Sequence, residues 1–90
     1  MTQQKSPPEI IFPVDWQFRI VVVAETAAAT REILGKVLKD HGVLNPLTDG
    51  AVSSGGKYRT FLVSVLLTGR EMMNQLAQEL ADVPGVKIVL

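Results

Sequence analysis

Cysteine is absent from this chain, and histidine occurs only once among its 90 residues. The first absence excludes disulfides, thiolate metal ligands and cysteine nucleophiles, and the second excludes a metal site built from several histidines. Charge of one sign is also missing, because nine basic residues balance nine acidic ones. A neutral chain has no net field with which to hold a phosphate backbone or an anionic membrane. We therefore expect no metal, no cofactor and no membrane partner, and nucleic acid is not favoured.

Long hydrophobic runs are missing as well. The longest one, from Ile20 to Ala24, is far too short to cross a bilayer, and residues 1–8 are polar with no apolar core of signal-peptide length. We therefore expect a cytoplasmic protein. The length predicts one domain, which we place at residues 13–90 behind a flexible tail of residues 1–12. A domain this small buries only about 60–65% of the surface that its unfolded chain exposes, so self-association would stabilise it.

What the chain does have is a regular alternation of hydrophobic periods. Runs with a period of two residues indicate strands, and runs with a period near 3.6 residues indicate helices. They predict the order β-α-β-β-α-β, with strands near residues 16–23, 43–54, 57–67 and 86–90 and helices near residues 26–40 and 68–82. This order is typical of a ferredoxin-like split βαβ fold, which belongs to the α+β class. Its four-stranded antiparallel sheet has the strand order 4-1-3-2, and both helices cover one face.

Capping residues mark the ends of the two helices. Thr26 is a candidate N-cap for the first helix, and Gly42 suits the left-handed position after its last turn. Thr68 and Glu71 have the spacing of a capping box, in which the hydroxyl accepts from one amide and the carboxylate from another. We therefore expect the second helix to start at Thr68.

The second strand has the weakest signal of the four. Pro46, Asp49 and Gly50 all disfavour a strand, although an edge strand tolerates them as protection against aggregation. Asp49-Gly50 could itself be the hairpin turn. We prefer residues 53–56 as the turn because this choice leaves two strands that are long enough to pair. It also predicts a bulge near Gly50.

The helix side of the sheet should carry the core. We expect the core to contain Phe18, Ile20, Val22, Ile33, Leu34, Val37, Leu38, Phe61, Val63, Val65, Leu76, Leu80, Val86 and Ile88. The opposite face, which no helix covers, should carry Gln17, Arg19, Val21, Val23, Thr60, Leu62, Ser64, Leu66, Lys87 and Val89.

Half of the side chains on that open face are apolar, whereas a solvated antiparallel face is usually polar. We therefore predict an interface with a second copy or with a partner protein. The predicted interface residues are Val21, Val23, Leu62, Leu66 and Val89. The alternative is that these side chains are simply exposed, as scattered apolar residues are on many protein surfaces.

Four short motifs occur in a specific order and spacing. They are Phe12-Pro13, the run from Trp16 to Ile20, the turn from Ser53 to Tyr58 and the ending from Val86 to Leu90. Together they resemble the YbeD-like family of small bacterial proteins of unknown function, over residues 11–90. The resemblance implies a ferredoxin-like fold similar to ACT-type regulatory domains, which often sense small molecules as dimers. A link to lipoate metabolism has been suspected for the family, and Val22 stands where the family commonly has glycine.

The resemblance also marks a candidate ligand site, because the family's turn and a basic position in its first strand both have counterparts here. The candidate ligand-binding residues are Arg19, Ser53, Ser54, Gly56, Lys57 and Tyr58. Successive amides in a glycine-rich turn can form a nest for an anion, and Lys57 adds a positive charge. The alternative is a hairpin turn without a ligand, since the turn leads into a strand and not into the helix of a phosphate loop.

Catalytic motifs are not recognisable in the sequence. His41 has no nucleophile or carboxylate at a characteristic spacing, and no carboxylate pair stands out. We therefore predict a protein that is not an enzyme but a regulatory or protein-interaction module, which self-associates or docks on a partner. A small-molecule sensor is the alternative. RNA binding is a weaker one, because Tyr58 is the only aromatic residue with the right parity to stack bases on the open face.

Overall fold

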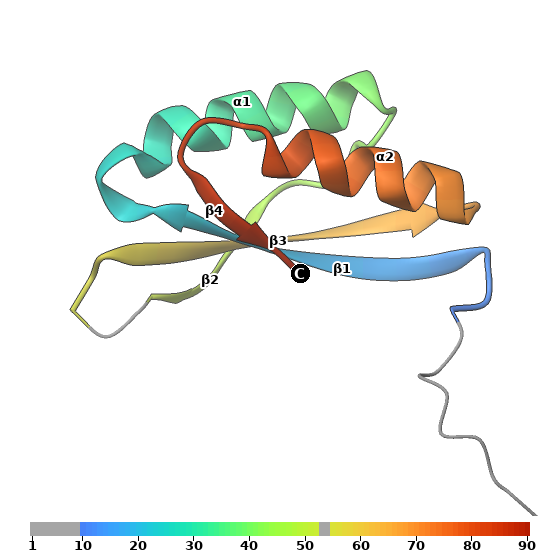
Figure 1. Cartoon of the computed structure of the whole chain (residues 1–90), viewed down its shortest axis with the longest axis horizontal. Helices are drawn as coiled ribbons and strands as arrows, with labels where there is room; N and C mark the ends of the chain where they lie inside the picture. Colours follow the sequence, from blue (N-terminus) through green and yellow to red (C-terminus); the bar gives the residue numbers. More distant parts are fainter. Residues whose placement is uncertain (1–9, 53–54) are drawn as a thin grey trace, which may run out of the picture.

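The computed structural model describes residues 10–52 and 55–90. Its elements are β1 (Val14–Val23), a 3₁₀ turn (Ala24–Thr26), α1 (Ala27–Asp40), β2 (Thr48–Val52), β3 (Tyr58–Leu67), α2 (Arg70–Ala81) and β4 (Val86–Val89). The four strands form one antiparallel sheet in the order β2-β3-β1-β4, which is the predicted order read from the other edge. Both helices lie on one face of this sheet, and the other face has no helix over it (Figure 1). The predicted α+β, ferredoxin-like architecture is confirmed.

The centre of the sheet is the long antiparallel pair β1 and β3. Ten residue pairs join them without a shift, from Val14 opposite Leu67 to Val23 opposite Tyr58. Because side chains alternate between the two faces, Phe18, Ile20 and Val22 all point toward the helices and are buried there. The complete core comprises Phe18, Ile20, Val22, Ala27, Leu34, Leu38, Leu47, Phe61, Val63, Val65, Leu67, Leu76, Leu80 and Val83. The predicted faces of β1 and β3 are therefore correct.

The last strand departs from the predicted alternation. Val22 lies opposite Val86, but Val21 lies opposite Ile88, so Lys87 is an extra residue that forms a bulge. Beyond a one-residue insertion every side chain changes face. Ile88, which we expected in the core, is 48% exposed on the open face. Val89, which we expected on the open face, lies opposite Ile20 and packs against the core.

The first helix is rotated slightly from the expected orientation. Its buried residues are Ala27, Thr30, Leu34 and Leu38, whereas Ile33 is 39% exposed. Thr30 takes a buried place because its hydroxyl donates to the carbonyl oxygen of Pro84, at 3.1 Å. A buried hydroxyl with a partner costs little, so this long-range bond is compatible with turning Ile33 toward solvent. The placement of Ile33 in the core was wrong.

The helix N-termini also differ from the expectation. Thr26 is the N-cap of α1, but its side chain makes no capping hydrogen bond. The expected capping box of α2 is wrong, because Gly69 occupies the N-cap position with an extended backbone. The hydroxyl of Thr68 donates instead to the sulfur of Met72, at 3.6 Å. At the other end of α1, Gly42 has the predicted left-handed φ of +76°.

The second strand is an edge strand with the predicted irregularity. Its register to β3 shifts between Asp49 and Val52, which confirms a bulge near Gly50. Asp49 and Gly50 belong to the strand itself, so they do not form the hairpin turn. β2 ends at Val52 and β3 begins at Tyr58, so the preferred turn residues 53–56 lie in the connection between the two strands. Ser53 and Ser54 lie outside the described residues, as does most of the predicted tail of residues 1–12.

Candidate functional site

The helix-free face of the sheet is the candidate functional surface. Across its centre Arg19 of β1 lies opposite Leu62 of β3, and Val21 lies opposite Thr60. Val21 and Leu62 are half-buried by their neighbours. Three large apolar side chains are much more open, with exposed fractions of 55% for Leu66, 48% for Ile88 and 56% for Leu90. We refer to Val21, Leu62, Leu66, Ile88 and Leu90 as the sheet-face patch.

A hollow of about 370 Å³ lies in this face around Arg19. Its lining residues are Gln17, Arg19, Val21, Gly50, Ala51, Thr60, Leu62 and Leu90. Leu90 is held there because its N–H and carbonyl oxygen each bond to the backbone of Arg19, at 2.8 and 3.1 Å. Gly50 packs closely against β3: a Cβ at this position would lie 3.3 Å from the side chains of Leu62 and Thr60. The bulge region of β2 therefore forms part of the wall of this hollow.

A second hollow, of about 580 Å³, lies at the hairpin end of the same sheet. Its lining residues are Val23, Ala24, Glu25, Gly56, Lys57, Tyr58 and Lys87. The carbonyl oxygen of Lys57 accepts the N–H of Ala24 at 3.0 Å, which ties the hairpin to the end of β1. The bulge in β4 places the Lys87 ammonium 6.0 Å from the centre of the Tyr58 ring, a cation–π distance. Two cations and one carboxylate thus share this hollow.

The structure separates the predicted ligand-binding residues into these two places. Gly56, Lys57 and Tyr58 line the hollow at the hairpin end, which we call the hairpin hollow. Arg19 lines the other, which we call the central hollow, and no residue lines both. Ser53 and Ser54 lie outside the described residues. Of the predicted interface residues, Val21, Leu62 and Leu66 belong to the sheet-face patch. Val23 lines the hairpin hollow, and Val89 is turned to the helix side.

Sequence reasoning missed Ile88, Leu90 and Gly50 as parts of this surface. The two apolar residues were missed because strict alternation does not anticipate the bulge at Lys87. For Gly50, a glycine within a strand was the available clue, because it indicates a bulge or the close approach of another backbone.

Groups that carry metal or acid–base chemistry are sparse in the described residues. Within residues 10–52 and 55–90, no three His, Cys, Asp or Glu side chains lie close enough to hold a metal ion together. His41 Nε2 lies 2.9 Å from the carboxylate of Glu79, and this contact joins the end of α1 to α2. In the same part of the chain, none of the helices has both the length and the apolar character needed to cross a membrane.

Comparisons with known proteins match this chain to a family whose function is unknown. The model of a family described as "Protein of unknown function (DUF493)" matches residues 7–90. A "UPF0250 protein" of Shewanella halifaxensis is 33% identical over 79 residues, with 88% of each chain covered. Another, of Pseudomonas fluorescens, is 27% identical over 84 residues and covers 92% of this chain and 91% of its own.

Two solved structures show the same fold. Protein HP0495 of Helicobacter pylori has a TM-score of 0.78 at 22% identity, with 100% of this chain and 94% of that chain covered. The ACT domain from the GTP pyrophosphokinase of Chlorobium tepidum has a TM-score of 0.59 at 15% identity, with 86% and 97% covered. At these identities the likeness concerns the fold alone.

Proposed function

This chain belongs to the DUF493 family of proteins of unknown function, the YbeD-like family that its motifs resemble, and from its own geometry we propose that it is a non-catalytic regulatory or protein-interaction module that self-associates through its helix-free sheet face. The single observation that carries the proposal is the sheet-face patch on a face that no helix covers. The likeness to an ACT domain, which in that protein is part of a larger enzyme, agrees with a role as a module. We also propose a cytoplasmic location.

Burial of the sheet-face patch provides the driving force. Each of its five side chains contributes roughly 1.5–3 kcal/mol when it is fully buried, so partial burial contributes on the order of 5–10 kcal/mol in total. The loss of translational and rotational freedom on association offsets much of this gain. Face-to-face packing of two twisted sheets is a common way to bury such a surface. The balance favours a reversible contact over an obligate one.

The charges on β1 favour a second copy as the occupant of this face. Asp15 and Arg19 both lie on the open face, two residues to either side of Gln17. When two copies of β1 pack face to face and antiparallel, Arg19 of one copy lies near Asp15 of the other. Arg19 has no ion-pair partner among the described residues. Self-association therefore supplies a carboxylate where burial of an unpaired guanidinium would be costly.

Charged substitutions in the patch test this proposal. We choose Leu62→Asp, which faces Arg19 across the strands, and Leu66→Lys, which faces Asp15, because each new charge then meets an opposite one in the monomer. We expect the double variant to stay folded and to show a lower weight-average mass than the wild type by light scattering over the same concentration series. Gln75→Lys, at an exposed site of α2, is the control and should leave the mass unchanged. Equal masses for the double variant and the wild type would reject the sheet-face contact.

The central hollow favours small-molecule sensing as a second candidate function. An apolar floor with one guanidinium suits a small carboxylate that has an apolar body. We expect such compounds, short fatty acids for example, to raise the melting temperature in a thermal-shift screen, since a ligand that binds only the folded state stabilises it. Arg19→Gln should remove the shift, whereas Lys57→Gln, in the other hollow, should retain it. The absence of any shift at millimolar concentration would argue against this candidate.

A further inference from the structure

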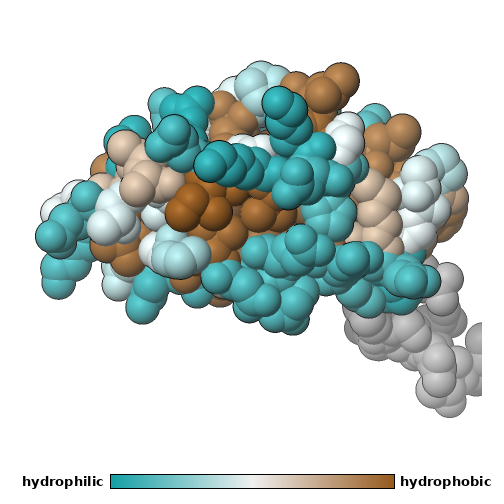
Figure 2. Space-filling model, turned by 90° about the horizontal axis from the view of Figure 1, so that it is seen from above, coloured by the Kyte–Doolittle hydropathy of each residue, from teal (hydrophilic) through white to brown (hydrophobic). Residues whose placement is uncertain are grey.

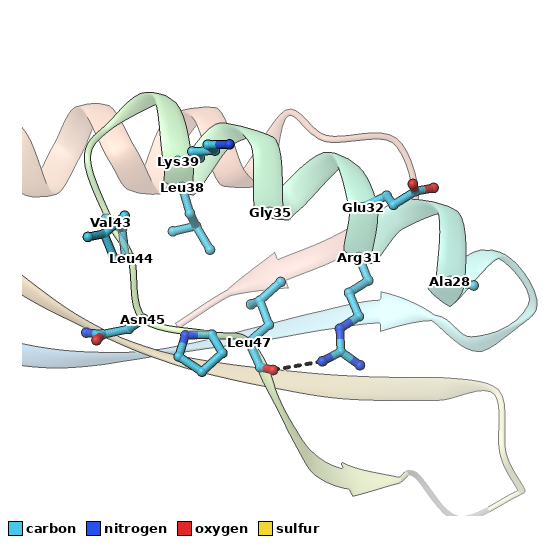
Figure 3. A pocket seen from close by; sticks show the side chains of 11 residues that line it. Ala28, Arg31, Glu32, Gly35, Leu38, Lys39, Val43, Leu44, Asn45 and Leu47 are labelled. Carbon is cyan, nitrogen blue, oxygen red and sulfur yellow. Dashed lines mark hydrogen bonds between the residues drawn. The ribbon is translucent and has the colours of Figure 1, made fainter.

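A separate groove lies on the outer side of α1, away from the sheet-face patch. It has a volume of about 460 Å³ and runs between the helix and the segment of residues 43–47. Figure 3 shows Leu38 and Leu47 extending into the space between them. The Arg31 guanidinium donates to the carbonyl oxygen of Leu47 at 2.9 Å and so holds that segment against the helix. Hydrophobic side chains also reach the surface on the helix side of the molecule (Figure 2), so apolar surface is not confined to the sheet face.

Gly35 lies in the middle of α1 and lines this groove. Glycine in a helix interior is destabilising relative to alanine, so a packing contact that excludes a Cβ would explain its presence. Gly35 has none in the described structure: a Cβ at this position would meet nothing within 4 Å, and the backbone is not left-handed. The missing side chain leaves the helix surface open at this point of the groove.

Two opposite charges flank Gly35 on the groove side of the helix. Glu32 and Lys39 both line the groove, three residues before and four residues after the glycine. Both are exposed, and neither joins an ion pair among the residues that the structure describes. Beyond Lys39 lies Leu44, which is 88% exposed, and at the other end of the groove lies Ala28 (Figure 3).

We propose that α1 packs antiparallel against α1 of a second copy, with the crossing point next to Gly35. In an antiparallel pair whose two-fold axis passes between Gly35 and Lys36, Glu32 of each copy faces Lys39 of the other, so both opposite-charge pairs form at once. The exposed Leu44 end of each copy then meets the Ala28 end of the other, where the side chain is small. Such a contact is isologous and closes on itself around a two-fold axis.

The charge pattern selects a second copy over other occupants. A small molecule or an unrelated protein does not require an acid and a base on either side of one point of the helix, whereas a two-fold axis between Gly35 and Lys36 pairs Glu32 with Lys39 in both directions. The contact buries little more than one helix face on each copy, so it is weak and depends on concentration. It is distinct from the sheet-face contact and does not rest on the function proposed above.

Charge reversal tests the contact in a way that only a second copy can satisfy. The experiment uses the full chain carrying Leu62→Asp and Leu66→Lys, so that the sheet face does not contribute. In that background Glu32→Lys places like charges opposite each other in a self-pair, and Lys39→Glu does the same. By sedimentation equilibrium, we expect the dissociation constant of each variant alone to be higher than that of its parent by about tenfold or more.

Mixing restores the complementary pairs. A mixture of the Glu32→Lys and Lys39→Glu chains, labelled with different fluorophores, should form a heterodimer that energy transfer detects. In it, both lysines of the first chain face glutamates of the second, position 32 opposite position 39 and position 39 opposite position 32. The double variant Glu32→Lys/Lys39→Glu should self-associate as its parent does. Loss of association without recovery in the mixture would overturn the proposal, as would equal association of all the variants. Neither result bears on the sheet-face contact.

The glycine supplies an independent test with opposite effects on stability and association. Gly35→Gln should raise the melting temperature by several degrees, because glutamine is a much better helix former than glycine. The same variant should abolish association through α1, because its side chain fills the groove. Ala29→Gln, at an exposed position of α1 six residues earlier, is the control and should leave association intact. Association of Gly35→Gln at the level of its parent would contradict the crossing next to Gly35.

Discussion

Replacing Gly85 with alanine is expected to lower the free energy of unfolding by about 2–5 kcal/mol. Gly85 has a left-handed φ of +92°, which costs an alanine about 1–2 kcal/mol. A Cβ there would also overlap the hydroxyl oxygen of Thr30 and lie 3.1 Å from that of Thr26. Thr30 cannot move aside freely, because it is buried and its hydroxyl donates to Pro84. Overpacking of this kind adds about 1–3 kcal/mol.

Gly56→Ala is the matched control for this prediction. Gly56 also has a left-handed φ, of +71°, but a Cβ there would meet nothing within 4 Å. Gly56→Ala should therefore lose only the free energy that a left-handed backbone costs an alanine, about 1–2 kcal/mol. Chemical denaturation of the wild type, Gly85→Ala and Gly56→Ala measures both losses of unfolding free energy. Equal losses for the two variants would mean that the loop before β4 does not press against α1 as described.

Replacing Leu34 with alanine is expected to lower the free energy of unfolding by about 2–5 kcal/mol. This is a large share of the roughly 5–15 kcal/mol that stabilises an ordinary domain. Leu34 is fully buried between α1 and the sheet, so truncation removes apolar contacts and leaves a cavity. Its neighbour Ile33 is 39% exposed, and alanine is the better helix former. Ile33→Ala should therefore cost less than about 1 kcal/mol.

This pair of variants tests the rotation of α1. The helical stripe read from the sequence includes both Ile33 and Leu34, and in that orientation both truncations would be costly. In the structure the buried line passes through Thr30, Leu34 and Leu38. Urea midpoints of the two variants distinguish the orientations. Similar losses at Ile33 and Leu34 would support the orientation read from the sequence.

Sequence reasoning succeeded where the signal is local and repeated. The order of the elements follows from hydrophobic periods, and the strand order follows from the short connections and from the handedness of crossovers. The two faces of β3 were correctly predicted because burial alternates regularly from Phe61 to Leu67. The bulge near Gly50 was also predicted, because glycine in a strand carries its own signal.

It failed where one residue or one distant contact sets the geometry. The extra residue Lys87 reverses the faces of Ile88 and Val89, and alternation alone cannot reveal an insertion that depends on how Val86 meets Val22. The burial of Thr30 depends on Pro84, which lies 54 residues away in sequence. The capping box failed because the motif fits Thr68, whereas the helix begins after Gly69.

The candidate site divides in the same way. Arg19, Val21, Leu62 and Leu66 were assigned to the open face from parity, and the structure places them there. The division of the ligand-binding residues into two hollows was not predictable, because it depends on the bulges of both edge strands. The groove beside Gly35 was not anticipated either, since its second wall comes from the loop that follows α1.

The sequence by itself determined the class of the fold, the strand order and the chemistries that the composition excludes, such as cysteine catalysis. These properties depend on composition and on neighbours within a few residues, so they can be read along the chain. Only the tertiary structure decided which side chains share a face at the end of β4, how α1 is rotated, and where the hollows and the groove lie. These properties arise from the fit between segments far apart in sequence, where one inserted residue or one buried hydrogen bond changes which groups meet.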